Sequence, residues 1–166
     1  MLTLSIISAA ILWGFIALSV GKFGVPTSYS ETYYLWNEVV KINHSGVFCL
    51  ISGIAGALLV PVMIQRGAGD VAQCMGFFAP AFLIIVAALP DYNGYYKWHH
   101  TIAAVISAIG TVCWQIFVCH VWWPMAVAAV AAILLMVATK TWKKSLVFWA
   151  EMAAFASTFI VLLFGL

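Results

Sequence analysis

The chain has 166 residues, of which 66% are hydrophobic and 15% aromatic, and only 7% carry a formal charge. A soluble domain carries about 25% charged residues, and a small chain with a mean hydropathy of +1.10 cannot bury so many apolar side chains in one core. The composition therefore excludes a soluble protein and a disordered chain, and a net charge of +2 provides no surface for nucleic-acid binding.

Six segments are apolar over roughly the length that a membrane-crossing helix requires, about 20 residues. They cover approximately residues 4–20, 45–64, 72–89, 101–119, 124–139 and 145–164. Pro124 separates the fourth segment from the fifth, because proline is favoured in the first turn of a helix and disfavoured in its interior. We therefore predict an all-α, polytopic integral membrane protein in which residues 1–166 form a single bundle of six transmembrane helices.

The first segment follows only Met1-Leu2-Thr3 and has no clear cleavage site. A secretory signal peptide would begin with basic residues and end at small ones. We therefore expect this segment to be the first helix of the mature protein.

The loop after the first segment has the pattern of a short helix lying in the membrane interface. Ser30 is a favourable N-cap, and Glu31 lies in the first turn, where a negative charge stabilises a helix. Apolar residues then recur at helical spacing, at Leu35, Trp36, Val39 and Val40. The alternative is a strap that merely joins two spans.

Small residues at four-residue spacing allow membrane helices to approach closely. Three such patterns are present: Ser52-x-x-x-Gly56, Ala103-x-x-x-Ser107 and Ala150-x-x-x-Ala154. They predict that the second, fourth and sixth spans form the inner layer, and that the same faces support a homo-oligomer. Pro80 predicts a kink in the third span.

Most of the chain's acidic residues and histidines fall on one face of the predicted bundle. Lysines also gather in the first, third and fifth loops, whereas Arg66 is the one basic residue of the second and fourth loops. By the positive-inside rule, we expect the lysine-rich loops to be cytoplasmic. The membrane we expect is a bacterial inner membrane. This face provides a candidate binding pocket made of Glu31, Tyr34, Glu38, His44, Asp91, Trp98, His99, His100 and Glu151. The alternative is that long loops simply hold the most polar residues.

Two polar residues lie deeper in the predicted spans. Glu151 follows the start of the sixth span by about two helical turns, and an ionisable residue inside a span indicates function unless a helix-end lysine pairs with it. Gln115 in the fourth span is typical of an interhelical hydrogen bond.

A metal site is a second interpretation of the same face. His44, His99 and His100 with an acidic residue are donors that favour zinc, and an open zinc position would activate water for hydrolysis of a lipid ester or amide. No HExxH or HxxxH motif supports this, and neighbouring histidines on a helix point different ways. Without this site, we expect no cofactor.

The string Pro26-x-Ser28-x-Ser30-x-Thr32-Tyr33-Tyr34, with Trp98-His99 opening the fourth span, resembles small uncharacterised bacterial six-span membrane proteins. A looser likeness is to the DRAM-like family, whose members carry a Pro-x-Ile-Ser-Asp string after the first helix. Here Glu31 stands in place of that Asp, and the Ile is absent. The resemblance implies a polytopic membrane protein linked to lipid or membrane homeostasis, without established catalysis.

Taken together, the residues favour binding or movement of a lipid headgroup, an amphiphile or a small solute through a polar, aromatic pocket at one membrane interface. The alternatives are a metal-dependent lipid hydrolase embedded in the membrane and a structural or pore-forming subunit of a membrane complex. The expected partners are membrane lipids and a second copy of the chain, with no nucleic acid.

Overall fold

The structure, a computed structural model, describes residues 1–40, 46–67, 69, 73–89 and 97–166. This part of the chain is all-α, as predicted, and contains no strand. Seven α-helices are present in it: α1 (Leu2–Phe23), α2 (Thr32–Val40), α3 (Gly46–Arg66), α4 (Gln73–Ala88), α5 (Lys97–Cys113), α6 (Trp123–Ala138) and α7 (Leu146–Phe164). A 3₁₀ turn, η1 (Tyr29–Glu31), precedes α2, and a π-helical turn, η2 (Trp114–Val118), continues α5.

Seven helices replace the six that were predicted as spans, because α2 is the short helix expected in the first loop. Within the described part of the chain, four helices are long and apolar enough to cross a membrane: Leu2–Phe23, Gly46–Arg66, Lys97–Val118 and Leu146–Phe164. Their length and composition are consistent with an integral membrane protein. α4 and α6 are equally apolar, but each has 16 residues, which corresponds to about 24 Å of helix.

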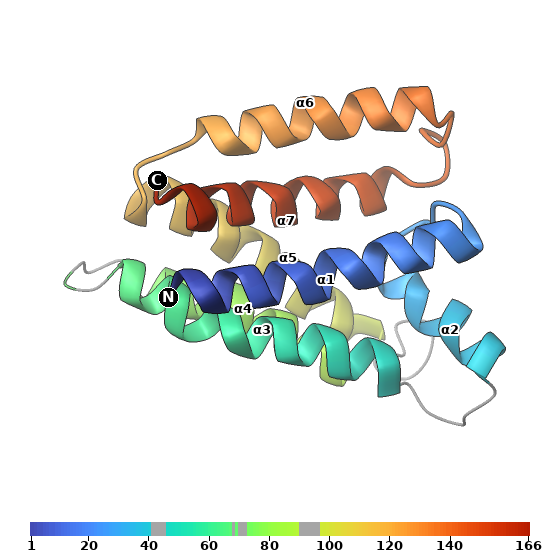
Figure 1. The fold of residues 1–166 in the computed structure, drawn as a ribbon, viewed down its shortest axis with the longest axis horizontal. Helices are drawn as coiled ribbons and strands as arrows, with labels where there is room; N and C mark the ends of the chain where they lie inside the picture. Colours follow the sequence, from blue (N-terminus) through green and yellow to red (C-terminus); the bar gives the residue numbers. More distant parts are fainter. Residues whose placement is uncertain (41–45, 68, 70–72, 90–96) are drawn as a thin grey trace.

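The long helices run back and forth, so that two ends of the bundle can be told apart (Figure 1). Both chain termini lie at one end, which we call the Arg66 end, together with the last residues of α3 and the first of α4. The opposite end, which we call the η1 end, holds the last turn of α1, η1, α2 and the first residues of α5 and α7. α6 lies alongside α7, on the outside of the bundle.

The tightest helix packing surrounds α4, the third predicted span, which lies between α3 and α5. A Cβ atom added to Gly76 of α4 would lie 2.6 Å from the carbonyl oxygen of Met63 on α3. Likewise, a Cβ atom on Gly110 of α5 would lie 3.0 Å from the backbone nitrogen of Ala79 on α4. These glycines allow the three backbones to approach closely.

The prediction that the second, fourth and sixth spans form the inner layer is therefore wrong in one respect. The third span, α4, also belongs to the inner layer. The small residues of the neighbouring spans do face inward as expected: Ser52 and Gly56 are buried, and the Ser107 hydroxyl donates a 2.7 Å hydrogen bond to the carbonyl oxygen of Ala79. In contrast, Ala150 on α7 is exposed, so the pattern that includes it does not contribute to the core.

Exposed tryptophans mark both ends of the bundle. Trp98 and Trp142 lie at the η1 end, and Trp122 and Trp123 lie at the Arg66 end. Tryptophan is enriched where a membrane meets water. The positions of these two pairs match those of aromatic belts at the two interfaces of a membrane.

Candidate functional site

Within the first loop, the η1 turn folds back into the end of the bundle, where Tyr29 and Ser30 are buried. Gly24 ends α1 with a φ of 78°, a left-handed conformation that glycine adopts without strain. The Ser28 hydroxyl then accepts a 3.2 Å hydrogen bond from the Glu31 N–H, so Ser28 caps η1. The N-cap expected at Ser30 is therefore wrong, because Ser30 lies inside the turn and its side chain has another partner.

Tyr29 is the centre of this arrangement and is 1% exposed. Its hydroxyl lies 2.6 Å from the hydroxyl oxygen of Ser52 on α3 and shares a hydrogen bond with it. Its ring packs against Phe48 and Phe155, with ring centroids 5.1 Å and 5.4 Å away. Burial raises the pKa of the Tyr29 phenol well above its usual value, and the charge of Glu151 acts in the same direction, while the bond to Ser52 opposes both.

The backbone N–H of Tyr29 donates a 2.6 Å hydrogen bond to Oε2 of Glu151 on α7. Glu151 is partly buried, so its carboxylate receives a backbone donor in place of some of its water. A second contact ties the same segment to α7, because the Phe148 N–H donates to the carbonyl oxygen of Thr27 at 3.1 Å.

Ser30 binds His100, which is 5% exposed in the first turn of α5. Nδ1 of His100 lies 2.6 Å from the carbonyl oxygen of Leu89, and Nε2 lies 2.9 Å from the Ser30 hydroxyl. Because a carbonyl oxygen only accepts, Nδ1 carries the proton of the neutral ring, and Nε2 accepts from the Ser30 O–H. This is the geometry of a hydroxyl beside a base whose orientation is fixed by a third group.

We call these five residues, Tyr29, Ser30, Ser52, His100 and Glu151, the η1 cluster. Through it, a two-residue stretch of the first loop makes one polar contact with each of three helices, α3, α5 and α7. The loop therefore closes the η1 end of the bundle and ties together helices that are far apart in the sequence.

The predicted pocket residues separate into three groups. His100 and Glu151 come together around η1, and Glu31 is adjacent, with its Oε2 accepting the Thr27 N–H at 2.5 Å. Tyr34 is partly buried beside the Tyr33 ring, whereas Glu38, Trp98 and His99 are exposed. His44 and Asp91 lie outside the described residues.

Sequence reasoning missed the roles of Tyr29, Ser30 and Ser52. Ser30 was assigned to a cap and Ser52 to helix packing, because each residue type is typical of that position. The usable signal was an aromatic residue, Tyr29, placed between two serines in the first loop.

Gln115 makes the interhelical hydrogen bond that its position predicted. Its Nε2 donates to the Ser157 hydroxyl on α7 at 2.9 Å. Its Oε1 is buried and has no partner within the described part of the chain. The carboxamide thus joins α7 to the π-helical turn that continues α5.

The histidines do not form a shared ligand set in the part of the chain that the structure describes. His99 is exposed while His100 is buried with both ring nitrogens bonded, so the two neighbours point apart, as expected on a helix. Among the described residues, no three His, Cys, Asp or Glu side chains are close enough to hold a metal ion. His44, the third expected ligand, is outside them.

Comparisons with protein-family models, with curated proteins and with solved structures each give no match. The resemblance drawn from the string around Ser28 and Ser30 therefore stays a prediction. Function is inferred from this chain's own residues.

Proposed function

We propose that this chain is a six-crossing protein of the bacterial inner membrane that binds or moves a lipid headgroup, an amphiphile or a small solute, with η1 as a removable closure of one end. The observation that carries this proposal is the hydrogen bond between Glu151, an ionisable residue within a membrane helix, and the Tyr29 backbone. Such residues are costly in a span, which makes function the default interpretation.

The partner of Glu151 favours a closure over a fixed structural pair. The carboxylate is bound by a backbone N–H of a loop, and no lysine among the described residues forms an ion pair with it. Because η1 lies outside every membrane-crossing helix, it can leave the bundle without breaking a helical hydrogen bond. A ligand with N–H or O–H donors would compete with Tyr29 for the same oxygen.

The paths of α4 and α6 support six crossings, and the distribution of basic residues between the two ends of the bundle supports the proposed orientation. α4 and α6 are nearly wholly apolar and run between the same two ends as the four longer helices. The η1 end carries most of the described basic residues, Lys22, Lys97, Lys140, Lys143 and Lys144, whereas the other end carries Arg66. We therefore assign the η1 end to the cytoplasmic side.

The test is movement of a fluorescent phospholipid between the leaflets of vesicles that contain the purified protein. Replacing Glu151 with glutamine keeps the shape and an acceptor oxygen but turns a charge-assisted hydrogen bond into a neutral one, which is about half as strong. We expect Glu151→Gln to release η1 more often and to raise the rate about fivefold. Lys97→Gln, which removes an exposed charge at the same end of the bundle, should leave the rate unchanged.

An unchanged or slower rate in Glu151→Gln would contradict the closure. If Glu151→Gln and Lys97→Gln both match the wild type, and no lipid moves in any sample, the chain is better described as a structural or pore-forming subunit.

Hydrolysis of a lipid ester is a second candidate, and the Ser30–His100 pair favours it. The Ser30 oxygen would attack the ester carbonyl while Nε2 of His100 takes its proton and returns it to the leaving alcohol; water then releases the acid. A fluorophosphonate probe should label Ser30 in the wild type but not in Ser30→Ala or His100→Gln, whereas Ser28→Ala should remain labelled. Absence of labelling would remove this candidate.

The metal-dependent form of this candidate has its own measurement. Zinc bound near stoichiometrically to the purified wild type, and lost in the His99→Ala/His100→Ala double variant, would support it. Equal zinc contents in the two proteins would argue against it.

A further inference from the structure

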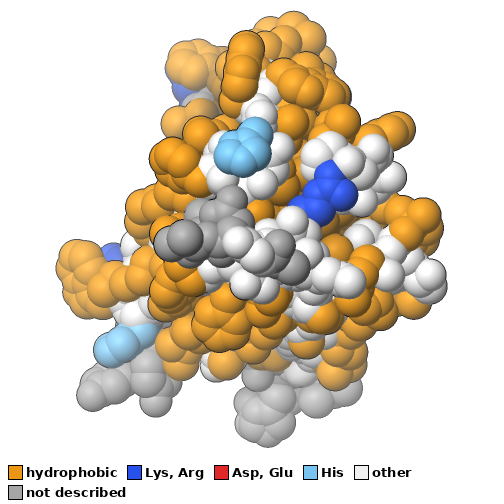
Figure 2. Space-filling view, turned by 90° about the vertical axis from the view of Figure 1, so that its left-hand side faces the viewer, with side chains coloured by type: hydrophobic (Ala, Val, Ile, Leu, Met, Phe, Trp, Pro, Cys, Tyr) orange, Lys and Arg blue, Asp and Glu red, His pale blue; other side chains and the backbone are white. Residues whose placement is uncertain are grey.

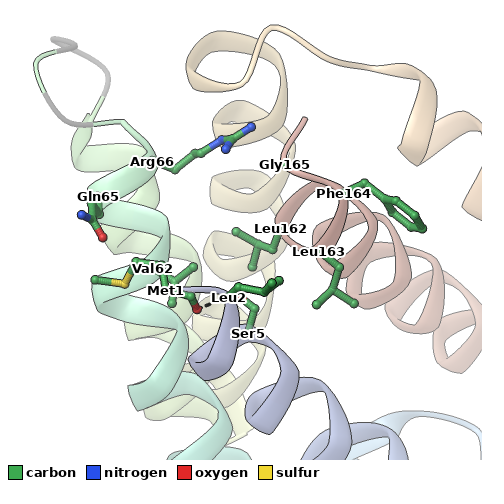
Figure 3. A pocket seen from close by; sticks show the side chains of 10 residues that line it. All are labelled: Met1, Leu2, Ser5, Val62, Gln65, Arg66, Leu162, Leu163, Phe164 and Gly165. Carbon is green, nitrogen blue, oxygen red and sulfur yellow. Dashed lines mark hydrogen bonds between the residues drawn. The ribbon is translucent and has the colours of Figure 1, made fainter.

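A groove of about 500 Å³ lies at the Arg66 end of the bundle, away from the η1 cluster. Its walls come from three helices: the start of α1, the end of α3 and the end of α7 (Figure 3). Leu2, Val62, Leu162 and Leu163 supply apolar surface, and Arg66 lies at one edge. The groove thus combines an apolar wall with a guanidinium group.

Arg66 is exposed and retains donors for a ligand. One guanidinium nitrogen donates to the backbone oxygen of Leu166, and the side chain also contacts the thiol of Cys119. A guanidinium has five N–H donors in a planar fork, which suits the oxygens of a phosphate. Arg66 is therefore only partly occupied by these contacts.

Among the residues that the structure describes, no acidic side chain lies beside Arg66. Burial raises the pKa of the Cys119 thiol to about 11, although Arg66 acts in the opposite direction, so this thiol is neutral at pH 7. The acidic residues that the structure describes, Glu31, Glu38 and Glu151, belong to the opposite end. In Figure 2, which faces the Arg66 end, none of the coloured side chains is acidic.

The groove also opens at the level where lipid headgroups are expected. Trp122 and Trp123, exposed at the same end, mark the membrane interface. Beside the groove, Leu2, Ile6 and Phe164 expose more than half of their surface and continue its apolar wall outward. An apolar surface of this kind is in contact with acyl chains when the protein is in a membrane.

We propose that this groove binds an anionic glycerophospholipid of the surrounding leaflet, with the phosphate at Arg66 and an acyl chain along Leu2, Leu162 and Leu163. The apolar walls favour an amphiphile as the ligand, and the exposed guanidinium of Arg66 favours an anionic headgroup. The site is independent of the η1 closure, because the two lie at opposite ends of the bundle.

The test is lipid retention by the purified full-length protein in detergent, measured by native mass spectrometry with phosphatidylglycerol and phosphatidylcholine of identical acyl chains. Both lipids carry the phosphate, but in phosphatidylcholine a quaternary ammonium group beside it is repelled by Arg66, so we expect a preference of about tenfold for phosphatidylglycerol. Arg66→Gln should abolish the preference, and Arg66→Lys, which keeps the charge but loses the fork, should retain part of it. Lys97→Gln removes one exposed charge at the η1 end and should retain all of it.

Two further measurements test whether the site binds a lipid. The first excludes a surface that merely attracts anions, and the second excludes a site for a free phosphate ester. Leu163→Trp, which fills the groove and leaves Arg66 in place, should weaken retention of both lipids. Glycerol 3-phosphate, which has the headgroup chemistry without acyl chains, should not displace bound phosphatidylglycerol. The proposal is overturned by an unchanged preference in Arg66→Gln, by an equal loss in Lys97→Gln, by unaltered retention in Leu163→Trp, or by displacement with glycerol 3-phosphate.

Discussion

The backbone N–H of Tyr29 and the carboxylate of Glu151 are 122 positions apart in the chain and are joined by a 2.6 Å hydrogen bond. The side chain of the same tyrosine reaches Ser52, and the next residue reaches His100. One turn of a loop therefore holds three helices at one end of the bundle, and the stability that this turn supplies can be measured one contact at a time.

The bond between the hydroxyls of Tyr29 and Ser52 should be measurable as a coupling. Tyr29→Phe and Ser52→Ala each leave one buried hydroxyl without its partner, so each should cost about 1–3 kcal/mol in unfolding free energy. The double variant should cost less than the sum, because both single changes break the same bond. Chemical unfolding in detergent of all four proteins gives the coupling, and strictly additive costs would contradict a shared bond.

Stability should fall at high pH because of Tyr29. Its pKa is raised in the folded protein, whereas in the unfolded chain the phenol ionises near pH 10. Above about pH 10 the unfolded state therefore loses a proton that the folded state keeps, and the unfolding free energy decreases by about 1.4 kcal/mol per pH unit. Below this pH the contribution is fully present.

Unfolding free energies of the wild type and Tyr29→Phe, compared from about pH 8 to about pH 11, isolate this contribution from that of the other tyrosines. The difference between the two proteins should be constant up to about pH 10 and then shrink. A difference that stays constant over the whole range would mean that the buried phenol ionises as readily as a free one.

His99 and His100 should differ in their effect on stability although they are neighbours. His100→Ala leaves the Ser30 hydroxyl and the Leu89 carbonyl without their ring partners, which should cost about 1–3 kcal/mol. His99→Ala removes an exposed side chain and should cost less than His100→Ala. Thermal unfolding of both variants makes the comparison, and equal losses would argue against the buried position of His100.

Alanine substitutions should rank the glycines by the space around them. Gly76→Ala places a methyl group 2.6 Å from the Met63 carbonyl oxygen and should be the most damaging. Gly56→Ala meets the Ile84 side chain at 2.8 Å and the Pro80 carbonyl oxygen at 3.2 Å, so it should cost less than Gly76→Ala. Gly53→Ala on α3 meets nothing within 4 Å and should gain up to about 1 kcal/mol from helix propensity. Unfolding free energies of the three variants test this order, and a large loss in Gly53→Ala would contradict the packing of α3.

Much of the fold could be predicted from the sequence because continuous apolar runs define membrane helices and because α2 has a helical apolar stripe. The sharing of one end by Glu31, His100 and Glu151 followed from counting spans. The position of α4 could not be predicted, since two of its close approaches depend on single glycines, Gly76 and Gly110, that belong to no repeated pattern of small residues.

The hydrogen-bond partners of the η1 residues could not be predicted from the sequence either. Hydrogen bonds of a loop have no sequence period, and they are set by which helix ends the packing brings together. His100 and Glu151 were recognisable as candidates by residue type, whereas Tyr29 and Ser52 acquire their roles only from their contact with each other.

The order of contacts around η1 has a consequence for biosynthesis. As the chain leaves the ribosome, Tyr29 is followed first by Ser52, then by His100, which binds its neighbour Ser30, and last by Glu151. At a synthesis rate of about 5–20 residues per second, the interval between Tyr29 and Glu151 is on the order of ten seconds. During that time the first loop is inserted beside helices that cannot yet hold it. The end of the bundle is thus completed only when the final helix arrives, and a chain truncated before α7 would expose an unfinished loop to the proteases that survey newly made membrane proteins.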